Sequence, residues 1–151
     1  MAQIRRARAV ELEALSALCL RSKAVHGYSA TLLEAFRQEL TLSHWDLDED
    51  EVAVAVDGED NILGVVQVST GPAGCFLEKL FVEPDRAGAG VGRVLMDWAC
   101  EAARRRGAPN MIIESDPGAV GFYTRYGARE AGTAPSESVS GRSLPRLLLK
   151  L

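Results

Sequence analysis

A glycine-rich stretch in the middle of this chain has the residue types of a phosphate-binding loop. The apolar run Leu77–Val82 ends before Pro84, and glycines follow at positions 88, 90 and 92, after which apolar residues recur with helical spacing. Glycines let backbone N–H groups approach a ligand closely, and a helix start adds unpaired donors and a positive dipole end. The stretch therefore predicts a strand, a loop and a helix that together bind a polyanion.

Basic residues at the same loop favour a polyanion from outside the chain. Arg86 precedes the glycines and Arg93 lies in the first turn of the expected helix, while no acid occurs between Arg86 and Asp97. A free helix is more stable with acids at its start, by about 0.3–1 kcal/mol, so positive charge there suits a bound polyanion. The alternative is that the glycines only make a tight turn and that the arginines are solvated.

The spacing of the glycines excludes two familiar nucleotide-binding loops. A P-loop needs Lys followed by Ser or Thr after its last glycine, and this chain has neither there. The dinucleotide fingerprint G-x-G-x-x-G fails because Arg93 or Leu95 stands where its third glycine belongs.

The loop and its flanks resemble motif A of the GCN5-related N-acetyltransferases. The matching residues are Val82-x-Pro84, Gly88-Ala89-Gly90-Val91-Gly92 and Val94-Leu95-Met96. The resemblance implies that acetyl-coenzyme A is the acyl-donor cosubstrate. It also implies that its pyrophosphate is held by Ala87, Gly88, Ala89, Gly90, Val91, Gly92 and Arg93. The family usually has Gln or Arg where this chain has Ala87, so that side-chain contact is lost while the backbone donors remain.

The same resemblance assigns a role to the strand before the loop. It implies that backbone groups of Leu80, Phe81 and Val82 pair with the pantetheine amides, as though the coenzyme were an added strand. A backbone N–H in this segment could also polarise the thioester oxygen.

A second stretch, Asp116–Gly127, is similar to the helix that follows the fifth strand of this family. Phe122 and Tyr123 match the family pattern, whereas Gly118 stands where the family often has Asn. Gly118 is assigned to the coenzyme on this resemblance, without the contact that an Asn side chain would make. The likeness is specific in the C-terminal half of the chain and extends to the N-terminal half only through the order of elements.

Acetyl transfer to an amine needs a proton donor for the leaving group. The amine loses a proton, attacks the thioester carbonyl and expels a thiolate. A thiol has a pKa near 8.5, and a tyrosine, with a pKa of about 10, is still protonated at neutral pH. Tyr123 is therefore the expected general acid, and the alternative is an aromatic packing role.

Glu78 is the expected general base for the amine proton. It lies four residues before Val82 on one strand, so both side chains are expected on one face, near the acceptor. A buried carboxylate with a raised pKa could take the proton directly or through water. The alternative is a surface pair between Glu78 and Lys79, with Glu114 and Tyr126 as other candidates for the base.

The histidines and cysteines are not assigned catalytic roles. His26 and His44 are isolated in expected loops and read as surface residues. Cys19, Cys75 and Cys100 lie in apolar contexts and read as core, without a partner that would support an acetyl-cysteine intermediate. Their number and spacing indicate neither a disulfide framework nor a metal site, so no metal is expected.

The rest of the sequence predicts the elements that position these residues. Expected strands are Ile4–Ala9, Glu51–Val56, Ile62–Ser69, Cys75–Val82, Asn110–Ser115, Ala128–Thr133 and Leu144–Leu151. Expected helices are Glu11–Ala24, Thr31–Leu42, a helix from the glycine loop to Arg106, and Asp116–Tyr126. The acidic segment His44–Glu51 is expected to be a solvated connection, and attraction of a cationic amine is its alternative reading.

The order of elements predicts an α+β (mixed α/β) fold. Several antiparallel strands come first, and a single β-α-β crossover then sets Asn110–Ser115 parallel to Cys75–Val82. With the resemblance, this gives a mostly antiparallel sheet of about seven strands with about four helices.

Length and composition favour one soluble domain spanning residues 1–151. A chain of 151 residues buries roughly 68–70% of its unfolded surface, and 47% hydrophobic with 25% charged residues is ordinary for a globular protein. The net charge of −4 argues against nucleic acid as a partner. The N-terminus lacks a signal-peptide pattern and no run is long enough to span a membrane, so a cytoplasmic location is expected.

These observations lead to one function and two alternatives. The expected function is N-acetyl transfer from acetyl-coenzyme A to a primary amine, by direct attack in a ternary complex. The alternatives are a catalytically silent coenzyme A-binding domain and a dinucleotide-binding oxidoreductase, the latter disfavoured because three strands and two helices precede the β-α-β unit. The acceptor, a small molecule or a peptide, stays open, as do other acyl donors and the oligomeric state, a homodimer included.

Overall fold

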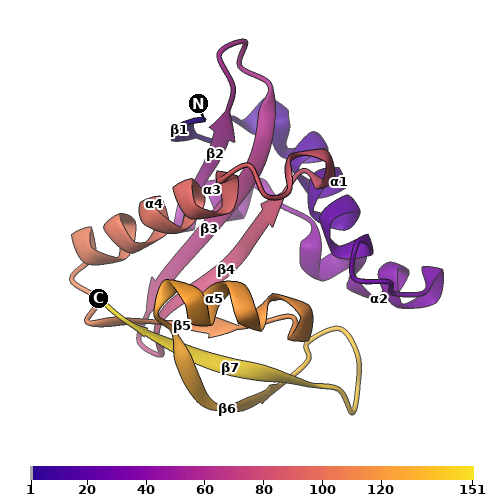
Figure 1. Ribbon diagram of the computed structural model, residues 1–151, viewed down its shortest axis with the longest axis vertical. Helices are drawn as coiled ribbons and strands as arrows, with labels where there is room; N and C mark the ends of the chain where they lie inside the picture. The colour runs from indigo at the N-terminus through magenta and orange to yellow at the C-terminus, as the bar shows by residue number, and fades with distance from the viewer. Residues whose placement is uncertain (1) are drawn as a thin grey trace.

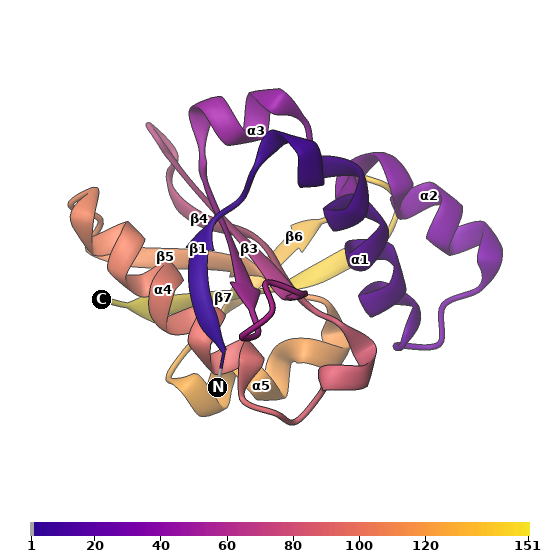
Figure 2. The ribbon, with the colours of Figure 1, turned by 90° about the horizontal axis from the view of Figure 1, so that it is seen from above.

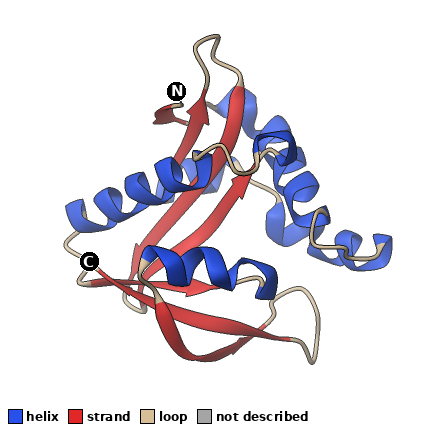
Figure 3. Ribbon diagram, viewed as in Figure 1, coloured by secondary structure: helices blue, strands red, loops and turns tan. Residues whose placement is uncertain are grey.

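The computed structural model describes residues 2–151, which form seven strands and five α-helices (Figures 1 and 3). The strands are β1 (Gln3–Arg6), β2 (Glu51–Val56), β3 (Ile62–Gly71), β4 (Gly74–Val82), β5 (Asn110–Glu114), β6 (Arg129–Pro135) and β7 (Ser143–Lys150). The helices are α1 (Leu12–Ala24), α2 (Ala30–Leu40), α3 (His44–Glu49), α4 (Val91–Arg105) and α5 (Val120–Tyr126). No helix within residues 2–151 has both the length and the apolar character needed to cross a membrane.

All seven strands belong to one mixed sheet. Its order is β1-β2-β3-β4-β5-β7-β6, and every neighbouring pair is antiparallel except β4 and β5. Helix α4 connects these two parallel strands. The predicted α+β sheet, mostly antiparallel and with one β-α-β crossover, is therefore confirmed.

The helices cover both faces of this sheet (Figure 2). On one face α4 and α5 contribute Val91, Leu95 and Tyr123 to a hydrophobic core. On the other face α1 and α2 contribute Leu15 and Phe36 to a second core. Strand β2 lies between the two cores, so all of its residues are buried.

The sequence of β2 explains how the two faces differ. Ala53 and Ala55 belong to the core under α4, whereas Val52, Val54 and Val56 belong to the core under α1 and α2. Alternate residues of a strand point to opposite faces, so the alanines form a shallow surface that α4 can approach closely. The larger valines fill the wider space on the other side.

Strands β4 and β5 are joined at only one point. Phe76 faces Ile112, and beyond this pair the strands separate toward their C-terminal ends (Figure 1). On its other side β4 stays paired with β3 as far as Val82. The edge of β4 that faces β5 is therefore open after Phe76, and the sheet divides into two halves around a gap.

The acidic segment His44–Glu51 is not the solvated connection that the sequence suggested. Its first six residues form α3, so residues 2–151 form five α-helices rather than about four. Ser43 and Asp46 make a capping box, in which the Ser43 N–H donates to Asp46 Oδ2 at 2.8 Å. The capping box is an ordinary signal for the start of a helix, but the many neighbouring acids favoured a prediction of a solvated connection instead.

Most other elements begin or end within a few residues of the predicted positions. β1 stops at Arg6 rather than Ala9, where a 3-10 turn leads into α1. α2 ends at Leu40, two residues early. The helix expected from Asp116 begins with the 3-10 turn Pro117–Ala119, and α5 follows.

Gly64 is predicted to be essential to the packing of α4 on β3. A β-carbon at this buried position would lie 2.8 Å from Leu95 Cδ1 and 2.8 Å from the backbone oxygen of Phe81, which cannot rotate away. Gly64→Ala should therefore destabilise the protein by about 1–3 kcal/mol in urea unfolding. Gly58→Ala is the matched control, because no atom lies within 4 Å of its β-carbon. Equal stability of the two variants would contradict this packing.

Candidate active site

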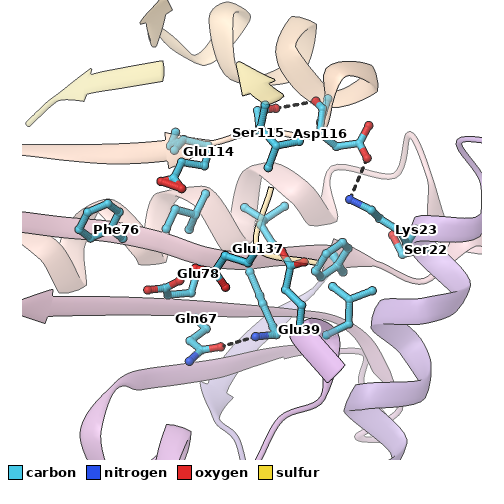
Figure 4. Close-up of a pocket in the computed structure, with 18 of the residues that line it drawn as sticks. Ser22, Lys23, Glu39, Gln67, Phe76, Glu78, Glu114, Ser115, Asp116 and Glu137 are labelled. Carbon is cyan, nitrogen blue, oxygen red and sulfur yellow. Dashed lines mark hydrogen bonds and ion pairs between the residues drawn. The ribbon is translucent and has the colours of Figure 1, made fainter. Parts of the chain in front are cut away.

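A cavity of about 580 Å³ opens where β4 and β5 separate. Its walls come from β4, the end of β5, α1, α2, α3, the start of α5 and the β6–β7 loop (Figure 4). Seven carboxylates line it against two lysines, Lys23 and Lys79. The cavity is therefore polar and acidic.

Tyr123 reaches this cavity from α5. Only 7% of the residue is exposed, and its hydroxyl forms no hydrogen bond with any side chain or backbone group of residues 2–151. Burial raises the pKa of Tyr123, and the negative charge of Asp116 raises it further. The phenol is thus protonated at neutral pH and available as a donor toward the cavity.

Glu78 reaches the cavity because β4 has a β-bulge at this residue. The register of β4 against β3 shifts between Gln67 and Val68, which leaves Glu78 as the extra residue. The expectation that Glu78 and Val82 share a face was wrong, because the bulge breaks the alternation and Val82 packs in the core under α4. Partial burial raises the pKa of Glu78, although Ser69 donates to its carboxylate at 2.7 Å.

The surface pair between Glu78 and Lys79 is not formed. Lys79 Nζ instead donates to Gln67 Oε1 at 3.2 Å (Figure 4). On the neighbouring strand Glu114 also lines the cavity, so it stays a candidate base. Tyr126 lies outside the lining and its hydroxyl donates to Asp97, so the structure does not support Tyr126 as a base.

The three residues of β4 that were assigned to coenzyme A differ in whether they line the cavity. Leu80 and Phe81 line the cavity, whereas Val82 does not. All three are paired with β3 on one side, and the edge toward β5 has no strand partner at this level. This open edge is the backbone arrangement that an added strand requires.

The glycine loop lies outside the cavity, at the far end of β4. Gly88 and Gly90 have φ angles of 81° and 83°, a left-handed conformation that glycine adopts readily. Within residues 2–151, no acceptor is bonded to the backbone N–H groups of Gly88, Gly90, Val91, Gly92 and Arg93. Five unpaired donors at the start of a long helix form a suitable contact surface for a polyanion.

Gly92 links this loop to the cavity. A β-carbon at position 92 would lie 3.1 Å from the ring of Phe122, which precedes the cavity residue Tyr123. Arg93, also assigned to the loop, lies over the ring of Tyr126 at 5.4 Å. The start of α4 therefore packs directly on α5.

A partly buried charged cluster lies at one end of the cavity. Asp116 Oδ2 accepts a hydrogen bond from Lys23 at 2.8 Å (Figure 4). The same oxygen accepts a hydrogen bond from the Tyr28 hydroxyl at 2.6 Å. Arg142, from the β6–β7 loop, donates to the same Tyr28 hydroxyl at 2.6 Å. Burial opposes ionisation of Asp116, but its bonds from Lys23, Tyr28 and Gly118 outweigh burial and lower its pKa to about 2.

His26, from the loop after α1, lies directly against Gly118. A β-carbon at position 118 would lie 2.5 Å from His26 Nδ1, so no larger residue fits without displacing that ring. The Gly118 N–H donates to Asp116 Oδ1 at 2.9 Å. His26 is exposed, as expected, and its ring occupies the space of the missing side chain and also lines the cavity.

Sequence reasoning missed several cavity residues. Lys23 and Glu137 lie in segments 22–30 and 134–143, for which the sequence suggests only a general role in acceptor selectivity, and Glu39 has no expected role. Asp46 and Asp50 are expected mainly to be solvated acids. These residues come from α1, α2, α3 and the β6–β7 loop, which meet only in the folded chain. The one usable signal was the acidic segment 44–51, read as attraction for a cationic amine.

The three cysteines are buried and unpaired, as the core reading predicted. Burial raises the pKa of Cys19 to about 12. None of the cysteines lines the cavity, and residues 2–151 contain no group of side chains arranged to hold a metal ion.

A family model described as acetyltransferase (GNAT) family matches residues 18–128. The chain belongs to the GNAT family of acetyltransferases. The peptidyl-lysine N-acetyltransferase YjaB of Salmonella typhimurium is 31% identical over 150 residues, covering 99% of this chain and 97% of YjaB. Its Escherichia coli counterpart is 33% identical over 147 residues, covering 97% and 94%.

Solved structures show that the GNAT fold extends over the whole chain. A GCN5-related N-acetyltransferase from Rhodopseudomonas palustris superposes with a TM-score of 0.85 at 19% identity, covering 100% of this chain and 96% of that one. The PaiA N-acetyltransferase of Thermoplasma acidophilum, in complex with coenzyme A, has a TM-score of 0.77 at 16% identity, covering 100% and 99%. At these identities the likeness establishes the fold.

Asp116 is predicted to stabilise the protein in a pH-dependent way. Its pKa is about 2 in the folded state, below the unfolded value of 3.8, so it contributes about 2 kcal/mol above pH 5, most of which is lost between pH 4 and pH 2. The loss in unfolding free energy caused by Asp116→Asn should therefore shrink across that range. Asp85→Asn, at an exposed carboxylate, is the control. A loss independent of pH would contradict the ion-pair account.

Proposed function

We propose that this GNAT acetyltransferase transfers the acetyl group of acetyl-coenzyme A to the side-chain amine of lysine in peptides or proteins. The observation that carries the proposal is the open edge of β4, which leads from the unpaired amides of the glycine loop to an acidic cavity. Tyr123 and Glu78 both line that cavity. The glycine loop and the β4 edge form the donor path, and the acidic cavity forms the acceptor chamber. The two meet at Tyr123 and Glu78, which can donate and accept protons.

The donor path fits the chemistry of coenzyme A. Gly88, Gly90 and residues 91–93 offer unpaired backbone donors for the pyrophosphate, beside the positive charges of Arg86 and Arg93. The N–H groups of Ala87 and Ala89, also assigned to the pyrophosphate, already donate to Pro84 and Arg86. Leu80–Val82 offers a strand edge for the pantetheine amides. The Gly118 N–H already donates a hydrogen bond to Asp116, so it is not a free donor for coenzyme A.

The acceptor chamber fits a cation. Its carboxylates outnumber its lysines, and one of the two lysines, Lys23, is neutralised by Asp116. An alkylammonium group is attracted to such a chamber, whereas a carboxylate or phosphate is repelled. Both YjaB relatives are named as peptidyl-lysine N-acetyltransferases, which favours lysine over other amines.

The reaction is direct attack in a ternary complex. Glu78, with a raised pKa, takes a proton from the ammonium directly or through one water. The neutral nitrogen then forms a bond to the thioester carbon, and the C–S bond breaks. Tyr123 donates its proton to the leaving thiolate and is reprotonated from solvent. The products are an N-acetyl-lysine and coenzyme A thiol.

Thiol release from acetyl-coenzyme A tests the function. Native protein should release thiol with lysine-containing peptides, and more slowly with free amino acids or aminoglycosides. Release should require both substrates, with intersecting double-reciprocal lines and no acetylated enzyme isolated without acceptor. Coenzyme A binding without turnover on any amine would instead favour the silent-domain alternative.

Tyr123→Phe is predicted to remove the proton donor and little else. The lost hydroxyl has no hydrogen-bond partner among residues 2–151, so folding and coenzyme A affinity should be nearly unchanged. Turnover should fall by about 10²-fold or more. Tyr126→Phe, on the same helix but outside the cavity, is the matched control and should retain activity. Parallel loss of turnover and coenzyme affinity in Tyr123→Phe would make Tyr123 structural.

A further inference from the structure

A second groove, of about 310 Å³, adjoins the acidic cavity at the β3–β4 turn. The two hollows share Trp45, Asp50, Phe76 and Glu78, so one leads into the other. If the acceptor lysine occupies the cavity, the residues next to it in the substrate chain lie beside this groove. This placement of the substrate chain rests on the proposed function.

The groove is lined by an exposed tryptophan that the fold holds in place. Trp45 is 64% exposed, although an aromatic ring of this size gains from burial. It sits on α3, whose start is fixed by the capping box of Ser43 and Asp46. Gln67, which is buried, donates to Asp46 at 3.0 Å and to Asp50 at 2.8 Å and so fixes the other end. The exposed ring is therefore displayed on an anchored helix.

The charges of the groove are all negative. Asp50 and Glu78 are its only ionisable lining residues. Neither forms an ion pair with any Lys, Arg or His of residues 2–151. Asp116, at the opposite end of the cavity, is by contrast paired with Lys23. Glu39, Glu114 and Glu137 also line the cavity without an ion-pair partner among residues 2–151, so the groove adds Asp50 and Glu78 to a site that is acidic throughout.

We propose that this groove binds a second basic residue, a lysine or arginine close in sequence to the acceptor lysine. Its cation would lie on the face of Trp45 and beside the carboxylate of Asp50. Aromatic faces attract cations, and a guanidinium also stacks on them. The groove therefore selects peptides in which the acceptor lysine has a basic neighbour.

Other neighbours suit the groove less well. A neutral apolar side chain would cover the two carboxylates without supplying a partner, which costs desolvation energy. An acidic side chain would be repelled by them. Only a basic side chain satisfies the aromatic surface and the carboxylates together.

A peptide series measures this preference. Each peptide carries one lysine in an alanine and glycine background, with arginine, glutamate or phenylalanine placed at one neighbouring position. Arginine at the position that reaches the groove should raise kcat/KM about 3- to 10-fold over alanine, and glutamate should lower it. The ratio of arginine to alanine peptide is the readout, because it cancels changes in overall activity.

Three variants of groove residues and one control variant test whether the preference for arginine over alanine depends on the groove. Trp45→Ala should bring the ratio close to one, whereas Trp45→Phe should retain most of it because an aromatic face remains. Asp50→Asn should lower the ratio. Val10→Ala removes a side chain that is 90% exposed and lines neither hollow, so its ratio should equal that of native protein.

The outcomes separate this inference from the proposed function. Acetylation of all peptides at equal rates, a preference for phenylalanine over arginine, or an unchanged ratio in Trp45→Ala would overturn the inference and leave the function standing. Absence of acetylation of every peptide and free amine by native protein would overturn both.

Discussion

The single contact between β4 and β5 is the constraint on which the site depends. Had these strands stayed paired beyond Phe76 and Ile112, the edge of β4 would be occupied and the cavity filled by β5. Their separation is sustained because each half of the sheet keeps a full partner, β3 for β4 and β7 for β5. The helices on the two faces then cover the gap without closing it. A break in backbone pairing that would be a liability at an exposed edge thus leaves an open strand edge that the proposed function uses.

The charges around the gap divide the site into two functional ends. The end near α1 and α5 is neutralised, because Lys23 and Arg142 converge on Asp116 and Tyr28. These bonds join segments that are far apart in the sequence, so they also hold the cavity wall together. The end near α3 keeps uncompensated carboxylates. The charges that hold Asp116 in place are therefore paired with one another, whereas Asp50 and Glu78 form no ion pair within residues 2–151.

The parts of the site that the sequence could predict are those encoded locally. The glycine loop, the start of α4 and the position of Tyr123 on a following helix depend on residues within one stretch, and the structure agrees with their placement. The parallel pairing of β5 with β4 was also predictable, because a helix, α4, connects the two strands. Length and periodicity also predicted the positions of all seven strands within residues 2–151. Their predicted ends lie within three residues of the observed ones.

The parts that escaped prediction depend on contacts between distant segments. The bulge at Glu78 arises from the register of β4 against β3, which no local pattern specifies. His26 fills the space beside Gly118 only because the loop after α1 folds onto α5. Glu137 reaches the cavity from a loop that had no assigned structure. Only α3 had a readable local signal, its capping box, which was obscured by neighbouring acids.

The central claim is that coenzyme A contacts the glycine-loop amides and the open edge of β4. An NMR titration of ¹⁵N-labelled protein with coenzyme A tests both parts in one experiment. The account predicts that the largest amide shifts fall on residues 88–93 and 80–82, with smaller shifts elsewhere. Absence of binding, or shifts confined to other segments such as α2, would contradict it.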